Sequence, residues 1–258
     1  VQITPDGYMY SDKKIKSFSF INHASGYFSN GSFNLMPFTG DSMDEKNIAA
    51  NFDHTDEIAT PYFYQVVLKN AGINAAFTAT ERTALCQFAF STTGTVHLLL
   101  SDINNTSIID SSTISGRCGD TYFILQSSKA FKDIVPYSTN DSFTKTVAVA
   151  TFPKAIVINY NTTKNETILV KIGFSKISFK GAENNIQLEQ PGWGFEATKQ
   201  QSKKIWNGKL SQVTIKSPDE NSKEIFYTAL YHTMFAPVVS SDAGAAKDLY
   251  EPLYPWDT

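Results

Sequence analysis

Short apolar runs separated by turn residues constrain the fold of this chain more than any other sequence feature. From residue 1 to about Lys180, apolar and polar residues alternate or form brief stretches rich in β-branched and aromatic side chains. The run 62–68, which ends at the turn sequence Asn70-Ala71-Gly72, is typical. Comparable runs occupy residues 32–36, 74–82, 84–90, 95–100, 122–126, 144–152, 155–160 and 167–174, and Pro37 is expected to end the first of them. About ten strands at hairpin spacing predict two packed antiparallel sheets, a β-sandwich.

Helical spacing replaces this alternation after Lys180. The sequence predicts a short helix over residues 181–189, a longer helix over 195–210 and a short strand over 210–215. A further helix is expected to begin at Pro218-Asp219-Glu220, because proline suits the first helical turn and acidic side chains suit its positive end. The predicted fold class is therefore mainly β, with helices only in the final third.

The last predicted helix has a wide apolar face that needs partners. Its apolar and small residues are Ile225, Phe226, Ala229, Leu230, Thr233 and Met234. The rest of the chain offers few partners, and Val1 reads as the middle of a strand, so we expect the chain to be part of a larger protein. The predicted division is a β-sandwich domain at 1–180, a helical linker with a short strand at 181–218, and the first helix and loop of a truncated helical domain at 219–258.

Composition excludes several functions and leaves others open. A formal net charge of -3 provides no basic surface for phosphate backbones, so nucleic acid is not expected as a partner. No apolar run approaches the roughly 20 residues that a membrane-spanning helix needs. Two cysteines, Cys86 and Cys118, exclude a disulfide-rich framework and a four-cysteine zinc site. Whether they are buried thiols or a disulfide stays open at this stage.

The sequence contains no local catalytic motif such as a glycine-rich phosphate loop or a nucleophile elbow. Acidic residues in the first quarter of the chain could supply carboxylate pairs for glycoside hydrolysis. The simpler interpretation is that they are solvent-exposed charges on loops. His97 lies inside an apolar run and is expected to be a sheet residue, whereas His23 lies on a glycine-containing loop. The acidic residues are Asp6, Asp12, Asp41, Asp44, Asp53, Asp56 and Glu57.

Several ordered sequence blocks resemble a known family. Residues 224–233 read E-I-F-Y-T-A-L-Y-H-T and are followed by Ser241-Asp242. Residues 23–26 read H-A-S-G, and residues 54–57 read H-T-D-E before the strand-like run that begins at Pro61. Further blocks occupy residues 35–40, 170–175 and 190–195. Together these blocks resemble glycoside hydrolase family 92 along nearly the whole chain.

The resemblance implies a two-domain enzyme. An amino-terminal β-sandwich of the super-sandwich type would be followed by a toroid of paired helices. The family removes terminal α-linked mannose from glycans such as N-glycans, uses calcium and inverts the anomeric centre. Inversion needs a general acid and a base-activated water, with the two carboxyl groups about 6.5–9.5 Å apart. The resemblance places the acid, the base and the calcium ligands beyond Thr258, so no catalytic residue or metal ligand is expected within this chain, and the chain alone is expected to be inactive.

Three residues are the predicted substrate-binding site. The closing Trp256-Asp257-Thr258 resembles the W-D-T at the start of the family's toroid, whose aspartate lies in the mannose pocket. Trp256 would then stack on the sugar and Asp257 would accept hydrogen bonds from its hydroxyl groups. His23 is the candidate from the sandwich. The expected partners are a mannose-containing glycan and the protein's own carboxy-terminal helical domain, and the expected location is secreted, periplasmic or on the cell surface.

The chain departs from the family pattern at places that bear on the sugar site. The family's Gly-Cys pair after H-x-S-G is replaced by Tyr27-Phe28-Ser29-Asn30, and its P-G-Y-Y is Pro61-Tyr62-Phe63-Tyr64. The stretch between Asp242 and Trp256 is also short. The sequence therefore leaves open which mannosidic linkage is cleaved. An alternative function for the chain is that of a stand-alone carbohydrate-binding or adhesion sandwich without catalysis.

Overall fold

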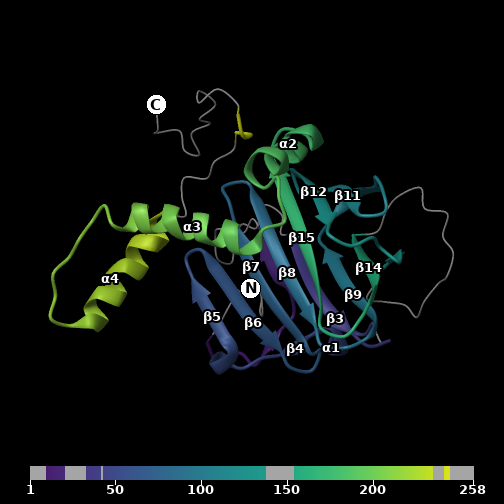
Figure 1. The fold of residues 1–258 in the computed structure, drawn as a ribbon, viewed down its shortest axis with the longest axis horizontal. Helices are drawn as coiled ribbons and strands as arrows, with labels where there is room; N and C mark the ends of the chain where they lie inside the picture. Colours follow the sequence, from purple (N-terminus) through teal and green to yellow (C-terminus); the bar gives the residue numbers. More distant parts are fainter. Residues whose placement is uncertain (1–9, 21–32, 42, 138–153, 235–240, 245–258) are drawn as a thin grey trace.

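The computed structural model describes residues 10–20, 33–41, 43–137, 154–234 and 241–244. Two antiparallel sheets and four α-helices organise this part of the chain (Figure 1). The larger sheet has eight strands in the order β10-β11-β12-β15-β8-β7-β6-β5, and the smaller has five in the order β13-β14-β9-β3-β2. The predicted mainly β fold, a sandwich followed by helices, is confirmed.

Each of the two sheets takes its strands from several parts of the chain. The strands of the larger sheet are β5 (Glu57–Thr60), β6 (Phe63–Leu68), β7 (Ile73–Ala79), β8 (Thr83–Phe90), β10 (Asn104–Ile108), β11 (Thr113–Cys118), β12 (Thr121–Ser127) and β15 (Glu166–Ser175). Those of the smaller sheet are β2 (Phe18–Phe20), β3 (Phe33–Thr39), β9 (Gly94–Ser101), β13 (Asp133–Pro136) and β14 (Ala155–Thr162). A separate short ladder joins β1 (Lys14–Ile15) to β4 (Ala50–Asn51).

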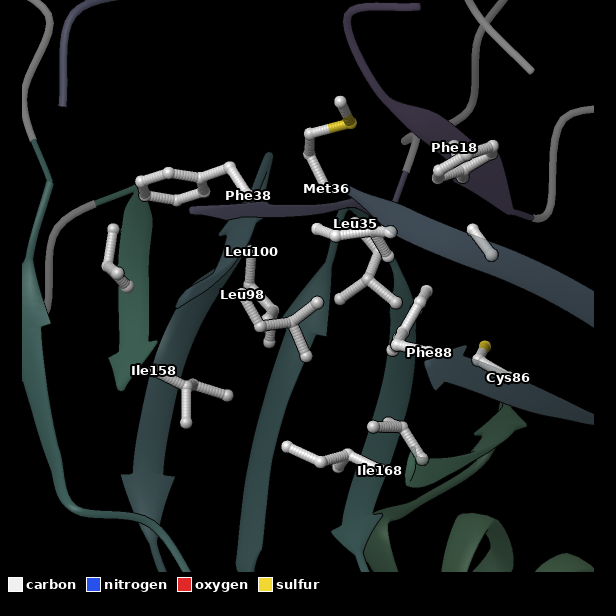
Figure 2. Packing of buried hydrophobic residues seen from close by; sticks show 14 of the residues in the cluster. Phe18, Leu35, Met36, Phe38, Cys86, Phe88, Leu98, Leu100, Ile158 and Ile168 are labelled. Carbon is white, nitrogen blue, oxygen red and sulfur yellow. The ribbon is translucent and has the colours of Figure 1, made fainter. Parts of the chain in front are cut away.

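The hydrophobic core lies between the two sheets. Alternate residues of each strand face inward, as the period-2 pattern predicts. Figure 2 shows Leu98 and Leu100 of β9 and Phe88 of β8 among the side chains of this core. Phe33 of β3 and Phe123 of β12 make an edge-to-face contact from one sheet to the other, with ring centroids 4.8 Å apart. Both rings are fully buried.

Pro37 does not end its strand, which corrects the sequence-based prediction. β3 continues through Pro37 to Thr39 and remains paired with β9 along this stretch. Proline lacks an amide donor and is tolerated at a sheet edge. Strand β2 pairs with β3 only from Phe33 to Leu35, so within the described residues Pro37 has a strand neighbour on one side only.

The edge strand β10 is irregular. Its register against β11 shifts between Asn104 and Ser107, which marks a bulge. Asn105, inside the bulge, has a φ of 48°, a left-handed conformation that asparagine tolerates better than most residues. The strand is therefore bent where it forms the outer border of the larger sheet.

Helix α2 (Phe179–Glu189) lies on the outer face of the larger sheet, over β12 and β15. Ser178 caps its first turn by accepting a hydrogen bond from the Gly181 amide. Ile124, Ala182 and Ile186 form a small second core beneath it. Gly173 of β15 permits this approach, because an added Cβ would lie 2.4 Å from the Ala182 carbonyl oxygen.

Helix α3 (Phe195–Leu210) crosses the larger sheet near β7 and β8, and α4 (Glu220–Thr233) follows beyond it (Figure 1). Asp219 caps α4 by accepting hydrogen bonds from the amides of Asn221 and Ser222. The strand predicted over 210–215 was wrong. α3 continues through Leu210, and residues 211–219 are turn and loop.

Two short helices in the first third, α1 (Glu45–Ile48) and the 3₁₀ turn η1 (His54–Asp56), were not predicted. Cys86 and Cys118 are free, buried thiols, so of the two alternatives left open by the sequence the structure has the thiols. Burial raises the pKa of Cys118 to about 12 and raises that of Cys86 further. Among the described helices, none combines the length and apolar character that a membrane span requires.

His97 is a structural residue of β9, as expected. Its side chain is buried, and its Nδ1 lies 2.6 Å from Oδ1 of Asn159 on the neighbouring strand. The imidazole ring stacks on Phe38 at a centroid distance of 4.7 Å. Sheet packing therefore accounts for this histidine.

Candidate functional site

A groove with a volume of about 680 Å³ lies between one side of the sandwich and α4. A volume of this size is typical of small-molecule sites. The sandwich contributes Phe18, Ser19, Phe20, Ala59, Thr60, Pro61, Tyr64 and Phe77, and the helices contribute Leu210, Glu224, Tyr227, Thr228, Tyr231 and His232. The groove thus joins the β part of the chain to its helical part.

Four aromatic rings form a continuous floor on the sandwich side. Phe77 of β7 contacts Phe18 at a centroid distance of 4.4 Å, Phe20 at 6.1 Å and Tyr64 at 6.2 Å. Phe18 and Phe20 face the same side of β2 because they are two residues apart. The floor therefore offers ring surfaces from three strands, β2, β6 and β7.

One face of α4 forms the opposite wall. Glu224, Tyr227, Thr228 and Tyr231 recur at helical spacing and so lie on the same face. The Tyr227 hydroxyl donates a hydrogen bond to the carbonyl of Val213, with a separation of 3.2 Å. Burial raises the pKa of Tyr231. This wall places a carboxylate and two tyrosines opposite the aromatic floor.

Further contacts hold the two walls in place. Tyr231 packs edge-to-face against Trp206 of α3, with centroids 5.0 Å apart. On the sandwich side, the Tyr64 hydroxyl donates to Oε1 of Glu57 at 2.7 Å. Oε2 of Glu57 lies 2.7 Å from Nδ1 of His54, so the carboxylate is shared between the two side chains. The H-x-x-E block of the sequence thus orients a ring of the groove floor.

The His54–Glu57 pair should make stability depend on pH. The hydrogen bond to Glu57, followed by that to the Tyr10 carbonyl, raises the pKa of His54 above its ordinary value of 6.5. A raised folded-state pKa contributes stability that is complete below about pH 6.5 and is lost as the pH rises through the folded-state pKa. We expect His54→Gln to lower the melting temperature more at about pH 5.5 than at about pH 9.

Tyr64→Phe is the matched control for this measurement. It removes a hydrogen bond from the same carboxylate without removing the histidine. Its effect on the melting temperature should be similar at both pH values. If His54→Gln lowers the melting temperature equally at both pH values, the pH dependence does not come from the His54–Glu57 pair.

The other acidic candidates that the structure describes lie outside the groove lining. Asp53 and Asp56 both bind Lys69, at 3.5 and 3.2 Å from its Nζ, and hydrogen bonds from Thr55 lower the pKa of Asp53 to about 2. Asp41 and Asp44 are exposed, and Asp6 lies outside the described residues. Across the described ranges, no group of three or more His, Cys, Asp or Glu side chains is placed to hold a metal ion.

The three predicted site residues, His23, Trp256 and Asp257, lie outside the described residues. Sequence reasoning missed the groove itself. The available signals were the alternating Phe18 and Phe20 and the helical spacing of Tyr227 and Tyr231. Neither signal indicates that the two segments face each other.

Fold and groove together define a class of protein: an antiparallel sandwich that continues into helices and has an aromatic groove where the two parts meet. Two family models match the chain. The glycosyl hydrolase family 92 N-terminal domain matches residues 2–175, and the glycosyl hydrolase family 92 catalytic domain matches residues 181–258. The chain belongs to glycoside hydrolase family 92.

Solved structures with the same fold include an α-mannosidase of family GH92 from Bacteroides thetaiotaomicron. It is 24% identical with a TM-score of 0.79, and the alignment covers 93% of this chain and 37% of that chain. An inverting mannosidase of the family from Bacteroides thetaiotaomicron VPI-5482 is 19% identical with a TM-score of 0.76, covering 92% and 34%. The chain therefore spans about a third of the length of these solved relatives. A search of curated protein sequences finds no match.

Proposed function

We propose that this chain is the amino-terminal part of an exo-α-mannosidase that releases terminal α-linked mannose from glycans with inversion. The groove between the sandwich and α4 would form one wall of the sugar site. Family membership supports glycoside hydrolysis, and solved relatives that share the fold are mannosidases. The observation that carries the proposal is the aromatic groove at the boundary between the β part and the helical part.

The lining of the groove suits a pyranose ring. Apolar C–H faces of sugars pack on aromatic rings, and Phe18, Phe77 and Tyr227 supply such surfaces. A few polar groups at the edge fix the orientation of a ligand, and the Glu224 carboxylate can accept hydrogen bonds from sugar hydroxyl groups. In the proposal, Trp256, Asp257 and His23 complete the site.

The general acid, the base and the calcium ligands are proposed to lie outside this chain. The described residues do not fit a calcium site, because they contain no suitable cluster of carboxylates. Inversion requires a protonated carboxyl on one side of the scissile bond and a base-activated water on the other. The sandwich would contribute binding and orientation of the glycan. A secreted, periplasmic or cell-surface location would suit that substrate.

The proposal predicts a clear division of activity. The purified 258-residue chain should not hydrolyse an aryl α-mannoside, whereas a protein that also contains the remainder of the family's catalytic domain should. A calcium chelator should abolish that activity because the metal is expected to hold sugar hydroxyl groups, and added Ca²⁺ should restore it. Product anomers, followed by NMR during the reaction, report inversion.

Three results would contradict parts of the proposal. Turnover by the chain alone would place the acid and base within it. Activity that survives chelation would remove the calcium requirement. Glycan binding without turnover by the longer protein would favour the alternative, a carbohydrate-binding sandwich.

A further inference from the structure

The tight turn between β5 and β6 contacts both the groove and helix α3. Pro61-Tyr62 forms this turn, and Thr60 and Phe63 pair on either side of it. The Thr78 hydroxyl of β7 donates a hydrogen bond to the Tyr62 carbonyl at 2.9 Å, which attaches the turn to the sheet. Thr60 and Pro61 line the groove, whereas the rings of Tyr62 and Phe63 interact with α3. The turn therefore links the floor of the groove to the position of α3.

One face of α3 packs on this turn. Phe195, Lys199 and Lys203 recur at intervals of four residues and so lie on the same face of the helix. The Phe195 ring contacts Phe63 edge-to-face at a centroid distance of 6.3 Å, and Nζ of Lys199 lies 4.2 Å from the centre of the Phe63 ring. Nζ of Lys203 lies 5.6 Å from the centre of the Tyr62 ring, within the range of cation–π interactions. These contacts hold the amino-terminal half of α3 on the sandwich.

Two buried polar residues hold the same half of α3 on the sheet. Thr198 and Ser202 are buried where α3 packs near β7 and β8. The Thr198 hydroxyl donates a hydrogen bond to Oε1 of Gln190, which is itself buried, at 2.9 Å. The amino-terminal half of α3 therefore has a defined place on the larger sheet.

The carboxy-terminal half of α3 and the segment after it contact α4. Figure 1 shows this end of α3 beside α4. The Trp206 ring packs edge-to-face against Tyr231 at a centroid distance of 5.0 Å, and the Val213 carbonyl accepts a hydrogen bond from the Tyr227 hydroxyl at 3.2 Å. Tyr227 and Tyr231 are about one turn apart on α4, and both line the groove. Two contacts one turn apart restrict both the position and the rotation of α4.

A chain of contacts thus connects the groove floor to the opposite wall, and all of its members lie within residues 60–231. It passes from the β5–β6 turn to α3 and then from Trp206 to Tyr231. α3 is a single helix of 16 residues, about 24 Å long, and a helix of this length acts as one rigid element. Trp206 does not itself line the groove, so its removal would alter the wall through Tyr231 rather than by deleting a contact to a ligand.

We infer that Trp206 is a positioning residue for the groove: its contact with Tyr231 couples the wall formed by α4 to helix α3, which the β5–β6 turn holds on the sandwich. This inference rests on the proposed function, because the groove is the proposed sugar site. It names the side chain that keeps Tyr231 opposite the aromatic floor.

Three substitutions separate this role from a general effect of losing a tryptophan. Trp206→Ala removes the contact with Tyr231, whereas Trp206→Phe keeps an aromatic ring at the same position. The matched control is Trp193→Ala. Trp193 is 36% exposed and packs on Lys171 of β15, with Nζ 4.1 Å from the ring centre, so it belongs to the sandwich contacts and not to the wall formed by α4.

The distance between α4 and the sandwich can be measured with spin labels on Ile225→Cys and Ile58→Cys, both exposed positions, in the 258-residue chain. The native cysteines are buried, so the label attaches to the introduced ones. We expect a narrow distance distribution in the labelled parent, in Trp193→Ala and in Trp206→Phe. In Trp206→Ala, the distribution should broaden or its mean should shift by more than about 2 Å.

Circular dichroism verifies that each variant is folded. If Trp206→Ala does not fold, Trp206→Leu takes its place, because leucine keeps apolar bulk but not the ring edge that contacts Tyr231. A broad distribution in the parent, or an unchanged distribution in the folded Trp206 variant that lacks the ring, overturns the inference. An equally large change in Trp193→Ala also overturns it.

An enzymatic readout separates the positioning role from the proposed function. In a mannosidase-active protein that contains this chain, Trp206→Ala should raise KM roughly tenfold with a smaller effect on kcat, because a displaced wall weakens binding that substrate and transition state share. Trp206→Phe should restore most of the loss, and Trp193→Ala should leave KM unchanged. A changed distance with an unchanged KM supports the positioning role and contradicts the groove as the sugar site. An unchanged distance overturns the positioning role whatever the KM.

Discussion

Phe33→Ala should destabilise the chain by about 3–5 kcal/mol, the usual cost of removing a fully buried phenylalanine ring. The Phe33 ring lies between the sheets and contacts Phe123 of β12 and Phe174 of β15, at centroid distances of 4.8 and 5.6 Å. Its removal deletes inter-sheet contacts and leaves a cavity that the two rigid sheets cannot readily close. Urea unfolding should show a lower midpoint with an unchanged slope.

Phe179→Ala is the matched control for this prediction. The Phe179 ring is 37% exposed and makes one edge contact with Tyr122 at 4.9 Å. Its loss should cost no more than about 1.5 kcal/mol. If the two variants lose equal stability, the contacts of the Phe33 ring between the sheets are not a major contribution to the free energy of unfolding.

Asp257→Ala should reduce kcat/KM roughly tenfold to a few hundredfold in a mannosidase-active protein that contains this chain. Under the proposed function, the Asp257 carboxylate accepts hydrogen bonds from hydroxyl groups of the sugar. Hydrogen bonds to charged groups contribute about 1.5–3 kcal/mol, which corresponds to this range. The melting temperature should hardly change, because a pocket-facing carboxylate does not pack in the core.

A structural role for Asp257 predicts the opposite result. An acidic residue at a helix start contributes about 0.3–1 kcal/mol through the helix dipole and does not affect turnover. Normal kcat/KM together with a lower melting temperature would therefore remove Asp257 from the proposed site. Asp257→Asn separates the charge from the shape of the side chain in the same assays.

Elements with strong local patterns were predictable from the sequence. The helix predicted over 195–210 has those bounds in the structure, because Pro191-Gly192 precedes it and helical spacing of apolar residues continues to its end. The strands predicted around residues 62–68, 84–90 and 155–160 are also present, since β-branched and aromatic residues dominate them.

Elements that depend on tertiary contacts were not predictable. β10 is polar and largely exposed, so its sequence shows no alternation of apolar and polar residues that would indicate a strand. β11 contains Gly116, which reads as a turn but allows the Phe123 ring to approach, because an added Cβ would lie 2.5 Å from its Cζ. Pro37 remains in a strand: it pairs with Leu98 of β9, and the described pairing of β2 with β3 ends at Leu35.

The groove depends still more on the three-dimensional arrangement. Phe18 lies near the start of the described chain and Tyr231 near its end, and no local pattern indicates that they line one cavity. Asp242 likewise accepts hydrogen bonds from Ser175 of β15 and Asn185 of α2, contacts that no periodic pattern in the sequence indicates. Local patterns predict elements, whereas these sites require knowledge of which elements meet.

The bulge in β10 has a consequence for how this protein behaves at high concentration. A straight border strand presents evenly spaced amide and carbonyl groups, onto which a strand of a second molecule can add. The register shift between Asn104 and Ser107 and the left-handed Asn105 interrupt that spacing. Intermolecular sheet extension at this border is thereby disfavoured, even though Ile108 and Ile109 are exposed beside it.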